Sequence, residues 1–143
     1  MTTRILIVDD SKRWRLFVRS ILDRSPWFQV VGEACDGVEA VTKATALLPH
    51  VVLLDIGMPR LNGIEAAKRI KQVCPASKVI FLTQETDLDV QNEALATGAV
   101  AYVLKTRAGE LQNVVDRAML HQKPQPRQPG DQSPEPAILF RGY

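Results

Sequence analysis

Five polar residues that could act together chemically stand where apolar runs of the sequence end. They are three carboxylates, one hydroxyl and one ammonium: Asp9, Asp10, Asp55, Thr83 and Lys105. Two carboxylates about 4 Å apart at an effective dielectric near 20 repel each other by on the order of 4 kcal/mol, so cations must offset their charge. Carboxylate oxygens together with water suit Mg²⁺. The set therefore predicts a magnesium site, with Lys105 neutralising part of the remaining charge.

A metal site alone does not explain the hydroxyl of Thr83 and the ammonium of Lys105. A site that handles a phosphoryl group does, because a cation and an ammonium stabilise charge on the transferring oxygens and a hydroxyl donates to one of them. A carboxylate is a competent nucleophile toward phosphorus. Asp55 is the best-placed acceptor because it follows the run Val51–Leu54, which has the composition of a central buried strand. Taken alone, Asp55 is equally compatible with a helix cap or a turn.

The apolar runs alternate about five times with segments of helical periodicity, which predicts βα units. The expected strands are Arg4–Val8, Phe28–Ala34, Val51–Leu54, Lys78–Thr83 and Ala99–Leu104. Connections of this kind give an α/β fold, a doubly wound parallel sheet with right-handed crossovers and helices on both faces. Parallel strands bring their carboxyl ends to one edge of the sheet, where open α/β sheets carry their sites. The second strand alternates more in polarity, so we expect it nearer an edge of the sheet.

Helices are expected where apolar residues recur at helical spacing between these strands. The most regular pattern comprises Leu111, Val114, Val115, Ala118 and Met119. For the helix that ends before Pro49, the expected inward residues are Val38, Val41, Thr45 and Leu48. The aromatic residues Trp14, Phe17 and Trp27 are expected in the core or as a lid over it.

Composition limits the classes of function. The chain has 143 residues, 45% of them hydrophobic, and a net charge of +2; this allows one ordinary domain and gives no charge argument for nucleic-acid or membrane partners. There is no signal peptide pattern and no apolar run near the roughly 20 residues of a membrane span, so a cytoplasmic location is expected. Cys35 and Cys74 are far apart, in no metal-like spacing, and are interpreted as small buried hydrophobic residues in a reducing cytoplasm. Glycine-rich dinucleotide and P-loop motifs are absent from the sequence.

The composition changes near residue 122. We expect a domain over residues 1–122 and a flexible, proline-rich tail over residues 123–143, with no room there for an output domain. Ala137–Phe140 forms a small apolar patch within this tail. It is interpreted either as an unpacked end or as a short strand that docks on a partner or on the domain itself.

Four sequence stretches carry a resemblance to a known family: Ile7–Asp10, Leu54–Pro59 followed by Asn62-Gly63, Leu82-Thr83, and Tyr102–Lys105. In this order and on these elements they resemble the receiver domain of bacterial two-component response regulators. The likeness runs from about Arg4 to His121. Three stretches are similar to the subfamily whose receivers precede a LuxR-type helix-turn-helix domain: Val31–Ala34, Asp36–Ala40 and Gly98–Lys105.

The resemblance implies a flavodoxin-like fold of strand order 2-1-3-4-5, a topology for which a chemotaxis receiver is a standard example. It implies that Asp55 accepts a phosphoryl group from a histidine kinase or phosphotransfer protein. Mg²⁺ would be held by Asp10, Asp55 and the backbone carbonyl of Gly57, with Asp9 contributing through water. Lys105 and Thr83 would contact the phosphoryl oxygens.

The resemblance also implies a conformational output. Tyr102 would move in concert with Thr83 and change the surface made by the fourth helix, the fifth strand and the fifth helix. Receiver homodimers or other protein partners would recognise that surface, with no direct nucleic-acid binding. Such a chain would be a phosphoacceptor, not an enzyme acting on other molecules, apart from its own phosphorylation and dephosphorylation.

The sequence departs from the family at one peptide bond and leaves two other classes open. Lys105 is followed by Thr106 where many receivers have proline, and a cis bond here would cost about 3 kcal/mol, so a trans bond is predicted. A pseudo-receiver that binds partners without phosphorylation is the main alternative. A hydrolase of the haloacid-dehalogenase kind would need Asp-x-Asp after the first strand, which Asp9-Asp10-Ser11 does not supply.

Overall fold

The computed structural model describes residues 2–120 and 138–140. Strands and helices alternate along the chain, as the apolar pattern predicts. The elements are β1 Thr3–Val8, α1 Lys12–Leu22, β2 Phe28–Ala34, α2 Gly37–Leu47, β3 Val51–Leu54, α3 Gly63–Val73, β4 Lys78–Thr83, α4 Leu88–Ala96, β5 Ala101–Leu104, the 3₁₀ helix η1 Lys105–Glu110, α5 Leu111–Met119 and β6 Ile138–Phe140.

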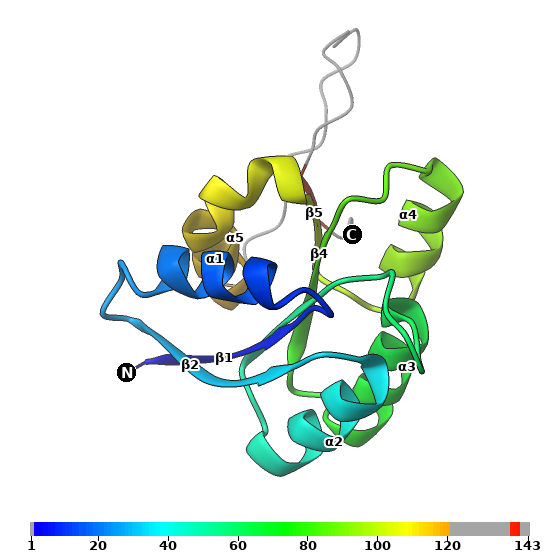
Figure 1. Cartoon of the computed structure of the whole chain (residues 1–143), viewed down its shortest axis with the longest axis horizontal. Coiled ribbons are helices and arrows are strands. Elements are labelled where there is room, and N and C mark those ends of the chain that lie inside the picture. The colour runs from blue at the N-terminus through cyan, green and yellow to red at the C-terminus, as the bar shows by residue number, and fades with distance from the viewer. Residues whose placement is uncertain (1, 121–137, 141–143) are drawn as a thin grey trace, which may run out of the picture.

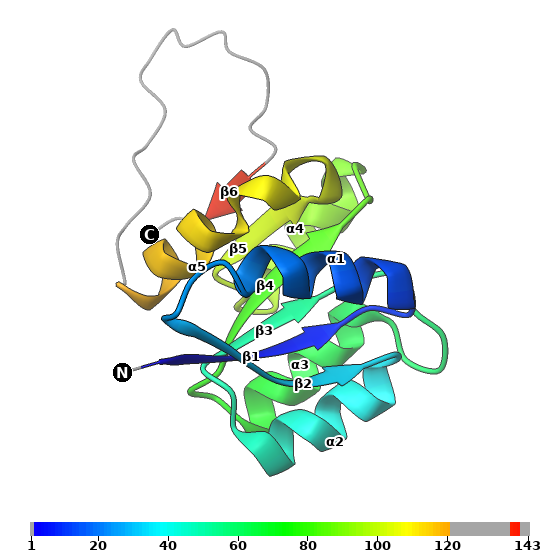
Figure 2. The same cartoon turned by 60° about the vertical axis from the view of Figure 1, so that its left-hand side comes forward.

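The strands form one sheet of order β2-β1-β3-β4-β5-β6. Figure 1 labels four of these strands, β1, β2, β4 and β5, and Figure 2 labels all six. The pairs among β1 to β5 are all parallel, which confirms the predicted flavodoxin-like order 2-1-3-4-5 and the edge position of β2. β6 adds an antiparallel strand outside β5. The strand pattern did not include this sixth member, although a docked Ala137–Phe140 segment was one of the two interpretations of that patch.

Helices cover both faces of the sheet (Figure 2), and buried side chains form a core on each face. On one face, α1 and α5 bury Val18, Ile21, Leu111 and Val115 against the odd-numbered residues of β1, β3 and β5 and the even-numbered residues of β4. On the other face, α2, α3 and α4 pack over the even-numbered residues of β1, β3 and β5 and the odd-numbered residues of β4. The central β3 is therefore buried along its whole length, as its continuous apolar run requires.

Helix starts are fixed by side chains that the sequence supplies at the right positions. Ser11, Asp36, Asn62 and Asp87 each accept a hydrogen bond from a backbone N–H in the first turn of α1, α2, α3 and α4. At Gly63 a Cβ atom would lie 1.9 Å from the carbonyl oxygen of Asp55, so only glycine permits this approach. The start of α3 is thereby held directly against the end of β3.

Some expectations about which side chains are buried are wrong. α2 buries Ala40 and Ala44, whereas Thr45 is exposed and Leu48 is 59% exposed. Small residues let α2 lie close to α3 and the sheet, and this places the larger side chains at the rim. Trp27 and Phe17 are 63% and 47% exposed, so of the two interpretations given for them, core or lid, the core interpretation is wrong. Cys74 is buried as expected, but Cys35 is exposed, so its expected burial is wrong.

The expected tail falls mostly outside the described residues. Of the proline-rich segment, residues 123–137 and 141–143 are not described, and Ile138–Phe140 forms β6. No peptide bond within the described ranges is cis, which confirms the trans prediction for Lys105-Thr106. Among the helices of the described part, none is long and apolar enough to span a membrane.

Candidate functional site

The carboxyl ends of β1, β3, β4 and β5 meet at one edge of the sheet and bring the predicted polar residues together. The backbone N–H of Asp55 donates to the carbonyl of Val8 at 3.1 Å, and that of Asp9 donates to the carbonyl of Ala34 at 3.0 Å. The sheet ladder thus continues one residue past the strands and fixes both carboxylates. Thr83 ends β4 and Lys105 directly follows β5.

We call Asp9, Lys105 and Asp55 the Lys105 trio. The Nζ atom of Lys105 lies 2.8 Å from Oδ2 of Asp9 and 3.3 Å from Oδ2 of Asp55. The three side chains are only 6 to 10% exposed. Lys105 Nζ also lies 4.7 Å from the ring centroid of Trp14, a favourable position for a cation. Lys105 therefore lies where its charge offsets that of both carboxylates, the position that the sequence predicts for it.

Asp55 keeps an unfavourable charge despite this cation. Desolvation by burial and repulsion from Asp9 raise the pKa of Asp55, and together they outweigh the opposing effects of Lys105, Thr83 and the Ile56 N–H. The Ile56 N–H donates to Oδ1 of Asp55 at 2.8 Å. A further cation that pairs with Asp55, or a phosphoryl group that esterifies it, would relieve the unfavourable electrostatic energy of this buried carboxylate.

The three carboxylates can share a metal ion. Single oxygen atoms of Asp9, Asp10 and Asp55 all lie within 4.8 Å of one another, with Asp10 exposed and the other two buried. This all-oxygen set, open to water on the Asp10 side, fits Mg²⁺ better than a soft metal. Each of the two buried carboxylates already accepts one backbone N–H at 2.8 Å, Asp9 from Ser11 and Asp55 from Ile56.

A pocket of about 310 Å³ opens over Asp55. Its lining residues are Asp55, Ile56, Gly57, Thr83, Gln84, Glu85, Thr86 and Lys105. The pocket therefore contains the predicted acceptor, the predicted hydroxyl, the predicted ammonium and the residue whose carbonyl was expected to bind metal. A side chain at Gly57 would meet no atom within 4 Å, so the pocket is open there.

Tyr102 is 1% exposed and points inward beneath the loop after β4. Its hydroxyl donates to the backbone carbonyl of Glu85 at 2.7 Å. Burial, followed by the nearby charges of Glu85 and Asp55, raises the pKa of Tyr102, so it stays neutral and acts as a donor. The Glu85 N–H in turn donates to Oγ1 of Thr83 at 3.3 Å. Thr83 and Tyr102 are therefore linked through one residue of the same loop.

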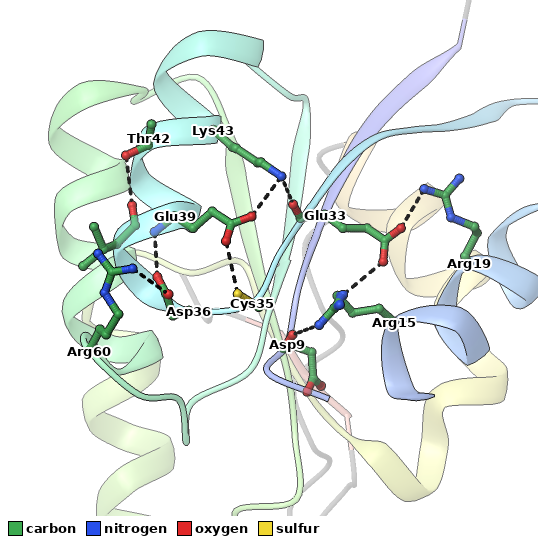
Figure 3. Close-up of polar contacts among 11 residues, drawn as sticks. Asp9, Arg15, Arg19, Glu33, Cys35, Asp36, Glu39, Thr42, Lys43 and Arg60 are labelled. Atoms are coloured by element: carbon green, nitrogen blue, oxygen red, sulfur yellow. Dashed lines mark hydrogen bonds and ion pairs between the residues drawn. The ribbon is translucent and has the colours of Figure 1, made fainter. Parts of the chain in front are cut away.

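Sequence reasoning missed a second group of charges, which we call the Glu33 network: Glu33, Arg15 and Arg19 (Figure 3). Nε of Arg15 lies 3.1 Å from Glu33, and Nη2 of Arg19 lies 2.9 Å from it. Arg15 also donates to the backbone carbonyl of Asp9 at 2.7 Å. The spacing of Arg15 and Arg19, four residues apart on α1, placed both on one helix face, but it gave no sign that Glu33 lay opposite.

A further acidic cluster lies at the start of α2 (Figure 3). Cys35 donates to Glu39, Asp36 caps the helix, and Asp36 also pairs with Arg60 at 3.2 Å. The hydrogen bond to Glu39 raises the pKa of the Cys35 thiol, which keeps it protonated. These partners give the cluster a structural role in fixing the start of α2.

Comparison with known proteins agrees with this geometry. The response regulator receiver domain family matches residues 5–116. The protein-glutamate methylesterase/protein-glutamine glutaminase 1 of Geobacter sulfurreducens is 39% identical over 120 residues, which are 82% of this chain and 33% of that protein. The transcriptional regulatory protein LiaR of Bacillus subtilis is 37% identical over 116 residues, 80% of this chain and 55% of LiaR. The chain thus spans about a third of the length of the methylesterases it matches.

Solved structures give the same result. The response regulator domain of Thermotoga maritima CheB superposes with a TM-score of 0.79 at 38% identity, over 87% of this chain and all of that domain. The receiver domain of the putative regulator NarL from Mycobacterium tuberculosis superposes with a TM-score of 0.76 at 32% identity, over 82% of this chain and 97% of that one. The chain therefore belongs to the response regulator receiver family of two-component systems, with relatives among both LuxR-family regulators and CheB methylesterases.

Proposed function

We propose that this chain is a working receiver in which Asp55 accepts a phosphoryl group in a Mg²⁺-dependent reaction. The donor would be the phosphohistidine of a histidine kinase or of a phosphotransfer protein. The observation that carries the proposal is the position of Asp55. This carboxylate is buried, its pKa is raised, and it lines an open pocket beside both Lys105 and Thr83.

In the proposed step, one carboxylate oxygen of Asp55 attacks phosphorus and forms a P–O bond. The P–N bond to the donor imidazole breaks, and the imidazole leaves with that electron pair and takes up a proton. The product is an acyl phosphate on Asp55. Bound Mg²⁺, held by Asp10, Asp55 and the Gly57 carbonyl with Asp9 beside them, would supply charge neutralisation.

Lys105 and Thr83 have separate roles in this proposal. Lys105 already forms ion pairs with Asp9 and Asp55. After phosphorylation, its ammonium would also pair with the new phosphoryl oxygens, and its contacts with the two carboxylates would weaken. The Thr83 hydroxyl would donate to one of those oxygens. Because the Thr83 hydroxyl accepts the Glu85 N–H and the Glu85 carbonyl accepts from Tyr102, movement of Thr83 would change the position of Tyr102. The surface formed by α4, β5 and α5 would then change its affinity for a partner.

We infer that the chain's own chemistry is limited to gaining and losing this phosphoryl group. The methylesterase relatives are about three times as long as the matched part, so their named activity is not assigned to these residues. The output would be protein contact, with a second receiver as one candidate partner.

The proposal is tested by intact mass after incubation with acetyl phosphate and Mg²⁺. We expect the wild-type chain to gain the mass of one phosphoryl group, and to lose this gain when Mg²⁺ is removed. The matched control is Asp55→Asn, which keeps the size of the side chain and removes the nucleophile. If neither acetyl phosphate nor a phosphorylated kinase transfers a group to a chain that still binds Mg²⁺, the chain is a pseudo-receiver.

A further inference from the structure

The outer edge of β5 is covered by the chain itself. β6 pairs with it in antiparallel orientation, with Phe140 opposite Ala101, Leu139 opposite Tyr102 and Ile138 opposite Val103. Figure 2 shows β6 beside β5 and next to α5, at the end of the sheet away from β2. An uncovered β5 would present unpaired backbone groups at this edge, which is a template for pairing with another chain.

The side chains of β6 extend this cover to both faces of the sheet. Ile138 and Phe140 pack against the core under α1 and α5, and Leu139 packs against the core under α4. The guanidinium of Arg117 on α5 lies 4.3 Å from the centroid of the Phe140 ring. β6 therefore covers parts of the α4–β5–α5 surface, and it engages a cation that would otherwise be available to a partner.

This cover is weak compared with the rest of the sheet. β6 has three residues, and all of them are only half-buried, whereas the four residues of β3 are completely buried. A pocket of about 200 Å³ lies between β6 and α5, so the packing there is incomplete. Short strands with one partner and little burial exchange readily between bound and released states.

We propose that β6 is a displaceable cover of the α4–β5–α5 surface, and that it competes there with a second copy of the chain. The charged side chains of this surface favour a second copy as the competitor. Asp89 and Glu93 are exposed on α4, and Arg117 lies on α5. In a two-fold arrangement the acidic helix of one copy can face the basic side chain of the other. Release of β6 frees Arg117 for that contact.

The trigger for release rests on the proposed function. Leu139 is paired with Tyr102, the residue whose movement would follow phosphorylation. A change in the position of Tyr102 would weaken the pairing of β5 with β6 at the middle of its three residue pairs. Phosphorylation would then expose the α4–β5–α5 surface by loosening β6, in addition to changing the shape of that surface.

The test uses the full chain carrying Ile138→Asp and Phe140→Asp together. These substitutions place charges against the apolar core under α5 and should release β6 without touching the Asp55 pocket. The matched control is Leu48→Asp with Val73→Asp, which adds the same charge at two exposed apolar residues, 59% and 46% exposed, at the ends of α2 and α3. Amide hydrogen exchange of β5 is measured at a dilution at which each chain is monomeric, so that a second copy does not protect β5. Sedimentation equilibrium is measured at higher concentrations, and neither measurement uses phosphorylated chain.

We expect the β5 amides that face β6 to exchange at least tenfold faster in the β6 variant than in the wild type or the control. We also expect its dimer dissociation constant to be at least tenfold lower. Unchanged exchange would show that β6 does not protect β5, and faster exchange with unchanged self-association would show that a second copy is not its competitor. Either result overturns the proposal.

These readouts do not require phosphorylation, so they separate this proposal from the previous one. A chain that gains no mass with acetyl phosphate, yet shows the expected exchange and dimerisation in the β6 variant, would fail only as a phosphoacceptor. A chain that gains mass normally but shows neither effect would fail only in the role given to β6.

Discussion

The Lys105 trio and the Glu33 network are built from the same kinds of groups but lie in different surroundings. Both hold carboxylates within 3.3 Å of a cation, and both adjoin the loop after β1. The trio has one cation for two carboxylates and is almost fully buried. The network has two cations for one carboxylate, and its side chains are 16 to 38% exposed.

This difference reverses the effect on the carboxyl groups. Desolvation is the largest influence on Glu33 and raises its pKa, but hydrogen bonds and attraction from Arg19 and Arg15 together exceed it and lower the pKa. At Asp55, desolvation and repulsion from Asp9 prevail, and the pKa rises. The network is therefore a satisfied structural contact, whereas the trio holds excess negative charge that a ligand can relieve.

The largest effect should follow from removing the cation of the trio. Lys105→Met leaves Asp9 and Asp55 buried without their partner, and uncompensated buried charges cost about 3–5 kcal/mol. We expect a loss of that size in the free energy of unfolding, measured by urea titration at pH 7 without Mg²⁺. The loss should become smaller at low pH, where Asp55 can be protonated.

The control for this substitution is Lys68→Met on α3. Lys68 pairs with Glu65 at 3.0 Å, and both side chains are about half exposed. Exposed pairs of this kind contribute about 0.2–1 kcal/mol. Equal losses in the two variants would contradict the distinction between the buried and exposed charge groups.

A smaller effect of opposite sign is expected at Asp55 itself. Asp55→Asn removes a desolvated charge that Asp9 repels, so it should stabilise the metal-free chain by about 0.5–2 kcal/mol at neutral pH. Because the folded-state pKa of Asp55 is raised, the charge costs stability above that pKa and the cost disappears as pH falls through it. The gain of the variant over wild type should therefore shrink on acidification.

Chemical denaturation at several pH values checks this sign, and Mg²⁺ gives an independent test. Added Mg²⁺ should stabilise wild type more than Asp55→Asn and so narrow or reverse the gap between them. A variant that is less stable than wild type in metal-free buffer at neutral pH would show that Asp55 is a net stabilising charge.

The sequence predicted the trio because its members lie at strand ends, and strand ends are visible in apolar runs. Asp9, Asp55 and Lys105 each follow such a run, and parallel pairing brings the ends together. Arg15 and Glu33 lie within a helix and a strand, where charged residues are ordinarily solvated. Their pairing depends on how α1 crosses β2, and apolar periodicity does not specify that crossing.

The inward face of α2 and the partner of β6 were not specified by the sequence, for a similar reason. Larger residues were expected on the inward face of α2, whereas Ala40 and Ala44 are the residues buried there, because α2 packs closely against α3. β6 is a three-residue apolar segment after a proline-rich stretch. Three residues are too few for a periodic pattern, so the sequence does not predict which strand they pair with. In both cases the deciding contact is between elements distant in sequence, and local pattern does not contain it.

The smallest expected effect separates the two arginines of the Glu33 network. Both pair with Glu33, but only Arg15 also holds the carbonyl of Asp9, at the peptide bond that leads to Asp10. Arg15→Gln should therefore let the predicted metal ligands shift, and residues of this supporting kind affect metal affinity by about tenfold. Arg19→Gln removes the same charge without that contact and should leave the affinity nearly unchanged.

The dissociation constant for Mg²⁺ can be followed by the fluorescence of Trp14, which lies against Lys105, in a Trp27→Phe background. Loss of one positive charge near the acidic site is common to both arginine variants, so the difference between them reports position alone. If both variants bind Mg²⁺ equally, the contact from Arg15 to the Asp9 carbonyl does not position the site. The Glu33 network would then be confined to joining α1 with β2, and the functional geometry would depend on the sheet ladder and the Lys105 trio.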